Sequence, residues 1–425
     1  MMKIYKEFSE DLIKFIDASP LNYFAVKNAS EILEGAGFKR LSEKENWALE
    51  RGKYYVIRDD SALIAFEIGK DPRDGFEIIG SHTDSPTFKV KSNPEIGTNG
   101  YLKLNIEPYG GMIHSTWLDR TLSLAGKVAY KEGDEIKYSL VNIDKNLLTI
   151  PNAAIHMNRE INKGYGYNPQ DKLYPLVKTI SDALEADGFI LKLLAEDLKI
   201  DEDAILDFDL GLYDRQAGAI INDMVQVGRI DNLGSVHASL RALVDSKEGA
   251  NKMIILNDNE EIGSRTRGGA ASNFLKAVLK RIALKSGLDE EGYQIMVENS
   301  MLISADQAHA IHPSYPEYSD PTNIVKMNEG LVVKIAANGA YASFVESKAR
   351  LFDLANKLGL KLQTFHNRND KTGGSTIGPI TTTVLGLKTI DVGIPMLAMH
   401  SVRELCGMKD HYEAYEIYKG FFEEI

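Results

Sequence analysis

Cysteine is nearly absent from this sequence, whose 425 residues include a single one, Cys406. An intrachain disulfide is therefore impossible, and a zinc module built on several cysteines is excluded. Any metal site must instead use histidine and carboxylate ligands. Because disulfides are a feature of oxidising compartments, their absence fits a reducing one and predicts a cytoplasmic protein.

Long apolar runs and an excess of basic residues are also missing. No run approaches the roughly 18 apolar residues of a transmembrane helix, and charges interrupt the first stretch, MMKIYKEFSEDLIKFIDASP, unlike a signal peptide. Acidic residues outnumber basic ones, 61 to 49, for a formal net charge of -12. This balance predicts neither nucleic acid nor an anionic membrane as a partner.

The composition is that of a globular protein, with 44% hydrophobic and 26% charged residues, and the length allows two or three domains. Strand and helix periodicities alternate up to about residue 87 and again after Gly228, which predicts an α/β fold with a mostly parallel sheet covered by helices on both faces. Over 88–227 short strands with glycine turns predominate, although we predict a helix over 172–187 and a strand over 191–200. We therefore predict one domain formed by 1–87 and 228–425, interrupted by an inserted β-rich domain over 88–227.

Residues of the types that bind metals follow several of the predicted strands. In an open α/β sheet, sites form outside the carboxyl ends of the strands, so residues far apart in sequence converge there. Taken singly, each of these residues is explained as well by a turn or a helix cap as by a metal site, but their order and number favour a shared site. They are His82 and Asp84 in SHTDSP, Asp231 in GRIDNLGS, Glu260 and Glu261 in NDNEEIGS, Asp306 in ISADQAHA and His400 in LAMHSVRE.

The chemistry of a zinc pair explains these residue types. Two zinc ions need a bridging carboxylate with imidazole and carboxylate ligands on either side, and a spare carboxylate to move protons. The adjacent carboxylates Glu260 and Glu261 repel each other unless a cation lies nearby. Asp84, two residues after His82, is placed to hydrogen-bond the imidazole and fix its tautomer.

These segments resemble the aspartyl aminopeptidases, a family of di-zinc aminopeptidases. The similar stretches also include YGGMIHSTWLDRTLSLAGKV, IPNAAIHMNREIN and STIGPI, so the resemblance runs from about residue 10 to the end of the chain. It implies that Glu260 is the general base and acid and that Asp84 supports a ligand. It also implies the metal ligands. One zinc would be held by His82 and Asp306, the other by Glu261 and His400, and Asp231 would bridge the two.

The same resemblance implies how the protein assembles and selects substrates. In that family the inserted domain mediates dimerisation, dimers build dodecamers, and a histidine matching His156 reaches the active site of a neighbouring subunit. A lysine matching Lys334 helps to select acidic N-terminal residues. The family often has Arg where Ala340 stands here, so a broader or neutral preference remains open.

A small-residue loop, KTGGSTIGPI, precedes a predicted helix. The backbone amides of Gly374, Ser375 and Thr376 are placed to contact substrate or an oxyanion, although a plain structural turn is an equal alternative.

We predict a metal-dependent aminopeptidase that removes N-terminal residues from peptides with two Zn2+ per subunit, for which Co2+ or Mn2+ can substitute. A di-zinc amidase or deacylase acting on small N-acyl substrates is one alternative, but it would not share the match in the inserted domain. A non-catalytic assembly scaffold is another, although it would be expected to have lost ligands. A serine mechanism is not indicated, since no Gly-x-Ser-x-Gly motif occurs.

Overall fold

The computed structural model describes residues 2–371 and 373–424. The chain forms two compact units. The first contains the described residues up to Asp84, Gly218–Met399 and those from Glu404 onward, and the second contains Ser85–Ala217 and His400–Arg403. The borders expected from the sequence, 87/88 and 227/228, lie three and ten residues further along the chain, and the predicted division placed His400 in the α/β domain.

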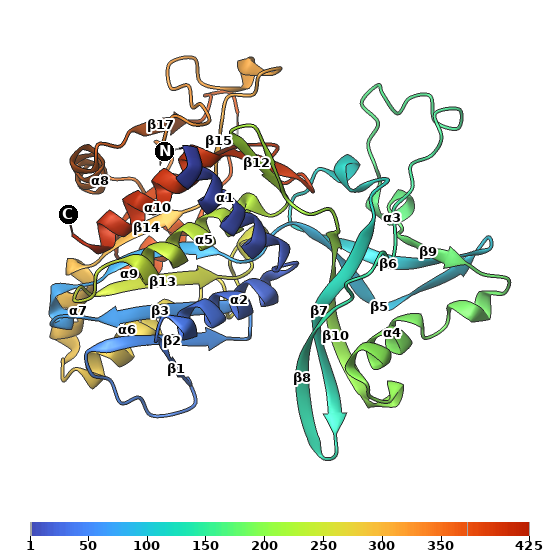
Figure 1. Ribbon diagram of the computed structural model, residues 1–425, viewed down its shortest axis with the longest axis horizontal. Helices are drawn as coiled ribbons and strands as arrows, with labels where there is room; N and C mark the ends of the chain where they lie inside the picture. The colour runs from blue at the N-terminus through green and yellow to red at the C-terminus, as the bar shows by residue number, and fades with distance from the viewer. Residues whose placement is uncertain (1, 372, 425) are drawn as a thin grey trace. The chain divides into compact units, whose positions relative to one another are not determined.

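A mixed sheet forms the centre of the first unit (Figure 1), and nine of its strands lie in the described residues. Five of its eight neighbouring pairs are parallel and three are antiparallel, which confirms a mostly parallel sheet. In spatial order the strands are β1 (Lys39–Leu41), β2 (Gly52–Arg58), β3 (Ala62–Ile68), β13 (Lys252–Asn257), β4 (Glu77–His82), β14 (Met301–Ala305), β18 (Lys388–Gly393), β16 (Leu331–Ile335) and β17 (Leu362–His366).

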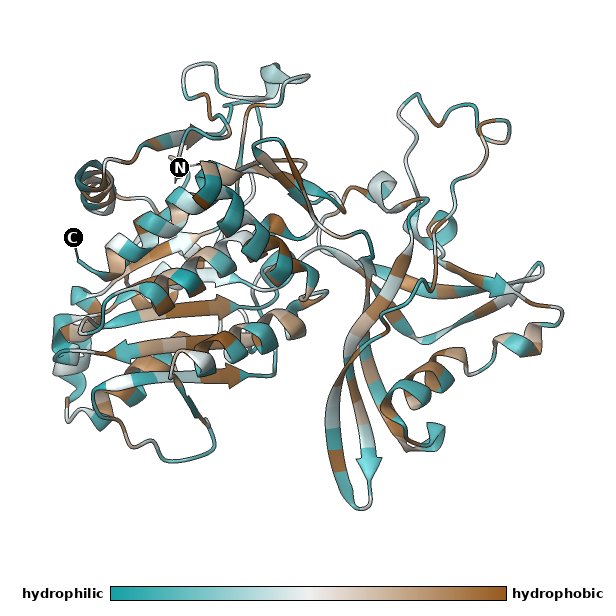
Figure 2. Ribbon diagram, in the orientation of Figure 1, coloured by the Kyte–Doolittle hydropathy of each residue, from teal (hydrophilic) through white to brown (hydrophobic). Residues whose placement is uncertain are grey.

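Helices cover both faces of this sheet because its strands carry apolar side chains on both sides. Figure 2 shows much of these strands in the brown of hydrophobic residues. In β13, Ile254 and Leu256 belong to one buried cluster, whereas Met253 and Ile255 belong to another. The first cluster includes α1 (Met2–Asp17), α2 (Asn22–Gly35), α5 (Ile230–Asp245), α8 (Val345–Leu358) and α10 (Met408–Phe422). The second includes α6 (Phe274–Lys285) and α7 (Glu290–Asn299), and α9 (Ile377–Leu385) packs on β18.

A smaller sheet also belongs to the first unit, with five strands in the described ranges. Its strands are β11 (Ala219–Ile221), β12 (Met224–Val227), β20 (Glu404–Gly407), β19 (Pro395–Leu397) and β15 (Ala308–His309).

The second unit is built on an antiparallel sheet, of which six strands are described. Its strands, in spatial order, are β8 (Glu135–Asn142), β7 (Leu122–Glu132), β10 (Ile205–Asp214), β5 (Thr87–Thr98), β6 (Tyr101–Tyr109) and β9 (Leu176–Thr179). The helix α4 (Phe189–Leu198) packs into its apolar cluster, and a short helix, α3 (Pro169–Lys172), precedes β9.

Two elements predicted for this unit are wrong. The helix predicted over 172–187 is β9 followed by a short 3-10 helix, because Pro175 disfavours helical backbone just before the strand. The strand predicted over 191–200 is α4, whose buried Ile190, Leu193 and Leu194 recur at helical spacing. Within the residues described, none of the helices combines the length and apolar character needed to cross a membrane.

Candidate metal centre

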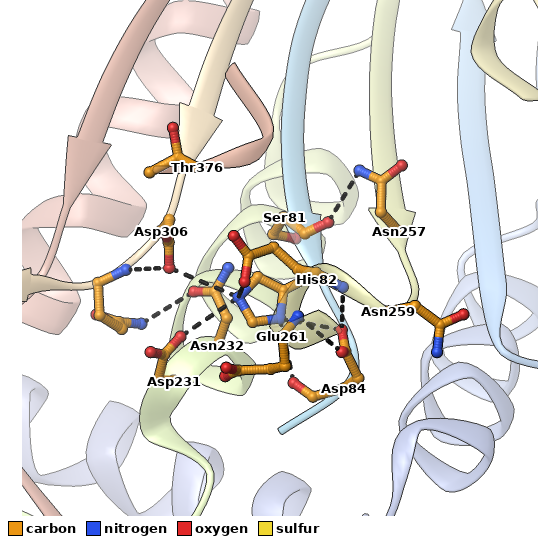
Figure 3. A network of polar contacts seen from close by, with 12 residues as sticks. Ser81, His82, Asp84, Asp231, Asn232, Asn257, Asn259, Glu261, Asp306 and Thr376 are labelled. Atoms are coloured by element: carbon orange, nitrogen blue, oxygen red, sulfur yellow. Dashed lines mark hydrogen bonds and ion pairs between the residues drawn. The ribbon is translucent and has the colours of Figure 1, made fainter. Parts of the chain in front are cut away.

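Neighbouring parallel strands bring most of the predicted ligands to one edge of the large sheet (Figure 3). The strand β4 pairs in parallel with β13 on one side and with β14 on the other. His82 is the last residue of β4, Asp306 follows β14 directly, and Glu260 and Glu261 open a short 3-10 helix just after β13. Because these strands run in the same direction, their carboxyl ends meet, as expected from the sequence.

The imidazole of His82 lies buried at the centre of the cluster. Its Nε2 is 3.3 Å from Asp231 Oδ1, 3.6 Å from Asp306 Oδ1 and 4.0 Å from Glu260 Oε2, and its Nδ1 is 3.3 Å from Asp84 Oδ1. Burial disfavours the charged imidazolium. Hydrogen bonds to Asp231, Asp306 and Asp84 outweigh this effect and hold the pKa of His82 well above its usual value.

The start of α5, which carries Asp231, is tied to the end of β14. The side-chain amide of Asn232 donates to the carbonyl oxygen of Ala305 at 2.9 Å, and the Asp231–Asn232 peptide bond is cis. Gln307 donates from Nε2 to the carbonyl oxygen of Ile230 at 3.0 Å. These contacts fix the position of Asp231 relative to the strand that precedes Asp306.

Asp84 connects His82 to the glutamate pair. Its two carboxylate oxygens accept the backbone N–H groups of Glu260 and Glu261, each at 3.1 Å (Figure 3). The sequence predicted only the contact with His82. The two contacts with backbone N–H groups were missed, because every residue except proline offers such a donor and no residue type marks it.

Glu260 has a carboxyl group suited to proton transfer. Its side chain is 18% exposed, compared with 5% for Asp231 and 1% for His82. Burial raises the pKa of Glu260 and the nearby His82 lowers it. The carboxylates of Asp306, Asp231 and Asp84 raise it further, to about 7. A group with a pKa near neutrality can both accept and release a proton under physiological conditions.

The donor set of this cluster fits a divalent cation. Ligand atoms of His82, Asp231 and Asp306 all lie within 4.8 Å of one another, as do those of His82, Glu260 and Glu261. Carboxylates packed this closely repel one another, so a bound cation stabilises the arrangement. Imidazole nitrogen and carboxylate oxygen are both zinc ligands.

Lys334, on β16, lies beside this cluster. It is 3% exposed, and its Nζ donates to the carbonyl oxygen of Gln307 at 2.9 Å and lies 3.4 Å from Asp306 Oδ2. Burial opposes the charge of the ammonium group, but the negative charges of Asp306, Asp391 and Asp231, together with the hydroxyl group of Tyr341, outweigh it and raise the pKa of Lys334. The lysine is therefore a fixed positive charge next to a predicted metal ligand.

The small-residue loop before α9 also lies in the first unit. Thr376 is buried, and its hydroxyl group donates to Asp391 Oδ1 at 2.6 Å. The Ser375 hydroxyl donates to the carbonyl oxygen of Ala340 at 3.3 Å, and Gly374 is exposed. Sequence reasoning missed Asp391, although an aspartate inside the apolar strand TIDVGIP was an available signal.

The two remaining predicted residues, His400 and His156, belong to the second unit. The carbonyl oxygen of His400 accepts the backbone N–H of Ile113 at 3.0 Å, and the residue has a left-handed backbone with φ of 64°. His156 is exposed in a loop before α3, between Ile155 and Met157, which are 48% and 84% exposed. The residues brought together within the first unit are thus His82, Asp84, Asp231, Glu260, Glu261 and Asp306.

Known proteins are similar to this chain in sequence and in fold over almost its whole length. The model of the family described as aminopeptidase I zinc metalloprotease (M18) matches residues 15–422. A probable M18 family aminopeptidase 2 from Clostridium novyi is 45% identical over 432 residues, covering 99% of this chain and 100% of the relative.

Two solved structures extend the comparison. The structure of the Ape4 and Nbr1 complex matches with a TM-score of 0.96 at 37% identity, covering 100% of this chain and 87% of the matched one. The mApe1 dodecamer of S. cerevisiae matches with a TM-score of 0.85 at 30% identity, covering 99% and 97%. With a strand-end cluster of zinc-type ligands and a family match of this extent, the chain belongs to the M18 family of zinc metallo-aminopeptidases.

Proposed function

We propose that this aminopeptidase works with two zinc ions and that Glu260 is its general base. The observation that carries the proposal is the cluster at the strand ends, where Asp231 and Asp306 approach His82 and the carboxyl group of Glu260 has a pKa of about 7. The side chain of Glu260, at 18% exposed, is also more exposed than those of Asp231 and Asp306, at 5% and 13%, which suits a group that must contact substrate.

In this proposal Asp231 would be shared by the two zinc ions, and His82 and Asp306 would hold the first. The distances among these three side chains support that part of the assignment. Glu261 and His400 complete the second zinc site. The role of His400 rests on the resemblance to the aspartyl aminopeptidases, and cobalt or manganese can replace zinc with such ligands.

In this proposal each side chain of the site has a separate role in hydrolysis. The zinc ions that these residues would hold supply Lewis-acid chemistry: when bound, they would polarise the carbonyl of the first peptide bond and lower the pKa of the attacking water. Glu260 takes a proton from that water and passes it to the departing amine. The carboxylate of Asp84 accepts the backbone N–H of Glu260 and orients the imidazole of His82. It therefore fixes the position of the proposed base relative to a proposed metal ligand.

A preference for acidic N-terminal residues is supported by Lys334. Among the described residues its ammonium group has two hydrogen-bond acceptors, Asp306 and Gln307, which leaves one of its three N–H groups for a substrate carboxylate. The backbone amides of Gly374, Ser375 and Thr376 are candidates for contacts with the substrate or an oxyanion. Ala340, where the family often has Arg, favours a preference broader than acidic residues alone.

We further propose that the protein forms homo-oligomers, dimers assembling into a dodecamer, in which His156 contributes to the site of a neighbouring subunit. The exposed apolar side chains of Ile155 and Met157, on either side of His156, support a loop that is covered by another chain. The related mApe1 of S. cerevisiae is a dodecamer. The single cysteine supports action in the cytoplasm.

The test is hydrolysis of the p-nitroanilides of Asp, Glu, Leu and Lys, with and without a chelator. We expect cleavage that the chelator abolishes and zinc restores. Glu260→Gln should lower kcat by about 10² to 10⁴-fold while the zinc content stays unchanged. Glu261→Gln is the matched control, since it removes a predicted ligand and should lower the zinc content.

Other outcomes would contradict the proposal. A fully active Glu260→Gln variant would exclude Glu260 as the base. Cleavage of N-acyl substrates alone would favour a deacylase. No activity on any unblocked substrate after metal loading would favour the non-catalytic scaffold.

A further inference from the structure

A buried carboxylate, Asp391, lies in β18 outside the predicted metal centre. It is fully buried, and such a group is costly unless it is hydrogen-bonded. Its Oδ1 accepts the hydroxyl group of Thr376 at 2.6 Å, and its Oδ2 accepts the backbone N–H of Ala342. The two donors come from separate loops, the turn over 340–343 and the small-residue loop that leads into α9.

Further contacts tie the same two loops to Asp391. Its own backbone N–H donates to Ser343 Oγ at 3.0 Å. Gly378, in the first turn of α9, packs so closely that a Cβ there would lie 2.5 Å from both carboxylate oxygens. The loops also contact each other directly, since Ser375 donates to the carbonyl oxygen of Ala340. Asp391 is thus the common anchor of both loops.

The turn over 340–343 lies next to Lys334, and the loop that leads into α9 contacts this turn through Ser375. The strands β16 and β18 pair with Val333 opposite Val392, which places Lys334 opposite Asp391 one step along the antiparallel register. The Nζ of Lys334 lies 5.4 Å from the ring centre of Tyr341, in the turn that Asp391 holds. The lysine expected to meet an acidic substrate side chain therefore lies among groups that Asp391 fixes.

We propose that Asp391 is a positioning residue for substrate selection. It holds the turn over 340–343 and the start of α9 in place around Lys334, so that the pocket for the substrate's N-terminal side chain keeps its shape. This inference rests on the proposed function, because it takes Lys334 as the group that recognises an acidic side chain. It adds a residue that touches neither metal nor substrate.

Thr376→Val tests the inference, because it removes the hydroxyl donor to Asp391 and keeps the shape of the side chain. We expect kcat/KM for Asp-p-nitroanilide to fall about 10-fold, mainly through KM, because a hydrogen bond to a charged group is lost. The value for Leu-p-nitroanilide should change less, so the ratio of the two falls. Zinc content should equal that of the wild type, and Thr376→Ser should restore the ratio.

Thr383→Val is the matched control. Its hydroxyl group donates to the carbonyl oxygen of Pro379 within α9, at 2.9 Å, and has no contact with Asp391. This variant should keep the wild-type ratio. If Thr376→Val does not fold, Ser343→Ala removes the acceptor of the Asp391 backbone N–H and should lower the ratio in the same direction.

An unchanged ratio in folded, zinc-loaded Thr376→Val would overturn the inference, as would a ratio that Thr376→Ser fails to restore. Failure of the proposed function looks different, because the wild type itself would then cleave no unblocked aminoacyl substrate. A wild type that cleaves both substrates equally well would remove the selective role of Lys334, and the inference with it.

Discussion

Asp84→Asn tests how the metal centre is held together, because Asp84 contacts a predicted ligand and the glutamate pair at once. The carboxylate accepts two backbone N–H groups, those of Glu260 and Glu261, each at 3.1 Å. An asparagine of the same size has one oxygen and one NH2 group, so it can accept only one of them. Its NH2 group would face the N–H of Glu261 in one orientation, and both the N–H of Glu260 and the ring of His82 in the other.

The expected loss can be estimated from these contacts. One hydrogen bond to a charged group contributes about 1.5 to 3 kcal/mol. Removing the outer partner of a metal-binding histidine typically weakens metal binding by about 10 to 100-fold. The loss of a negative charge beside the cation acts in the same direction. We therefore expect the Kd for zinc to rise by about 10 to 100-fold, equivalent to about 1.4 to 2.8 kcal/mol.

The assay is a competition titration of zinc against a chromophoric chelator near neutral pH. Asp353→Asn serves as the control, because it removes the charge of an exposed aspartate whose partner is Lys357 on the same helix, α8. A Kd for Asp84→Asn within about twofold of the wild-type value would refute the reasoning. In that case the carbonyl oxygen of Asp84, 3.1 Å from His82 Nδ1 and retained in the variant, would be sufficient to orient the imidazole.

Two stability predictions concern charged side chains away from the site. Lys252→Met should destabilise the protein by about 3 to 5 kcal/mol in urea unfolding, because it leaves Glu67, now 2.8 Å from Lys252 Nζ, buried without its cation; if adding Glu67→Gln recovers none of this loss, the reasoning is wrong. Asp11→Asn should cost about 1 kcal/mol near pH 7, allowing for the partial exposure of Asp11. Burial opposes ionisation of Asp11, but His237 and Arg241 outweigh it and lower its pKa, so this stabilisation is present above about pH 4 and is lost on acidification. An Asp11→Asn difference that stays constant from pH 7 to about pH 2 would contradict this account.

The α/β unit and its part of the candidate site were predictable because their signals are local. An apolar run such as MIILN indicates a buried strand wherever it occurs, and the residues that follow a strand lie at the edge of the sheet. His82, Glu261 and Asp306 could therefore be placed together without any knowledge of the pairing. The family resemblance added roles that spacing alone left open.

Features that depend on distant contacts were not predictable. His400 belongs to the second unit because of contacts such as the hydrogen bond that its carbonyl oxygen accepts from the Ile113 N–H. Backbone contacts of this kind cannot be predicted from residue types. The contacts of Asp84 with backbone N–H groups are equally invisible in the sequence. The helix α4 was missed for another reason, since a short apolar run with i, i+3 and i+4 spacing fits either a buried strand or a helix.

The place of β4 in the sheet has a consequence for how the protein is made. This strand leaves the ribosome before its two neighbours, β13 and β14, which follow more than 150 residues later, since His82 pairs with Asn257 and Gly80 with Ser304. If translation proceeds at about 5 to 20 residues per second, the neighbouring strands are synthesised on the order of 10 to 45 s after β4. During synthesis an apolar strand with both edges open must be kept from aggregating. Zinc binding also cannot promote the folding of the nascent chain, because the metal ligands come together only after this long-range pairing is complete.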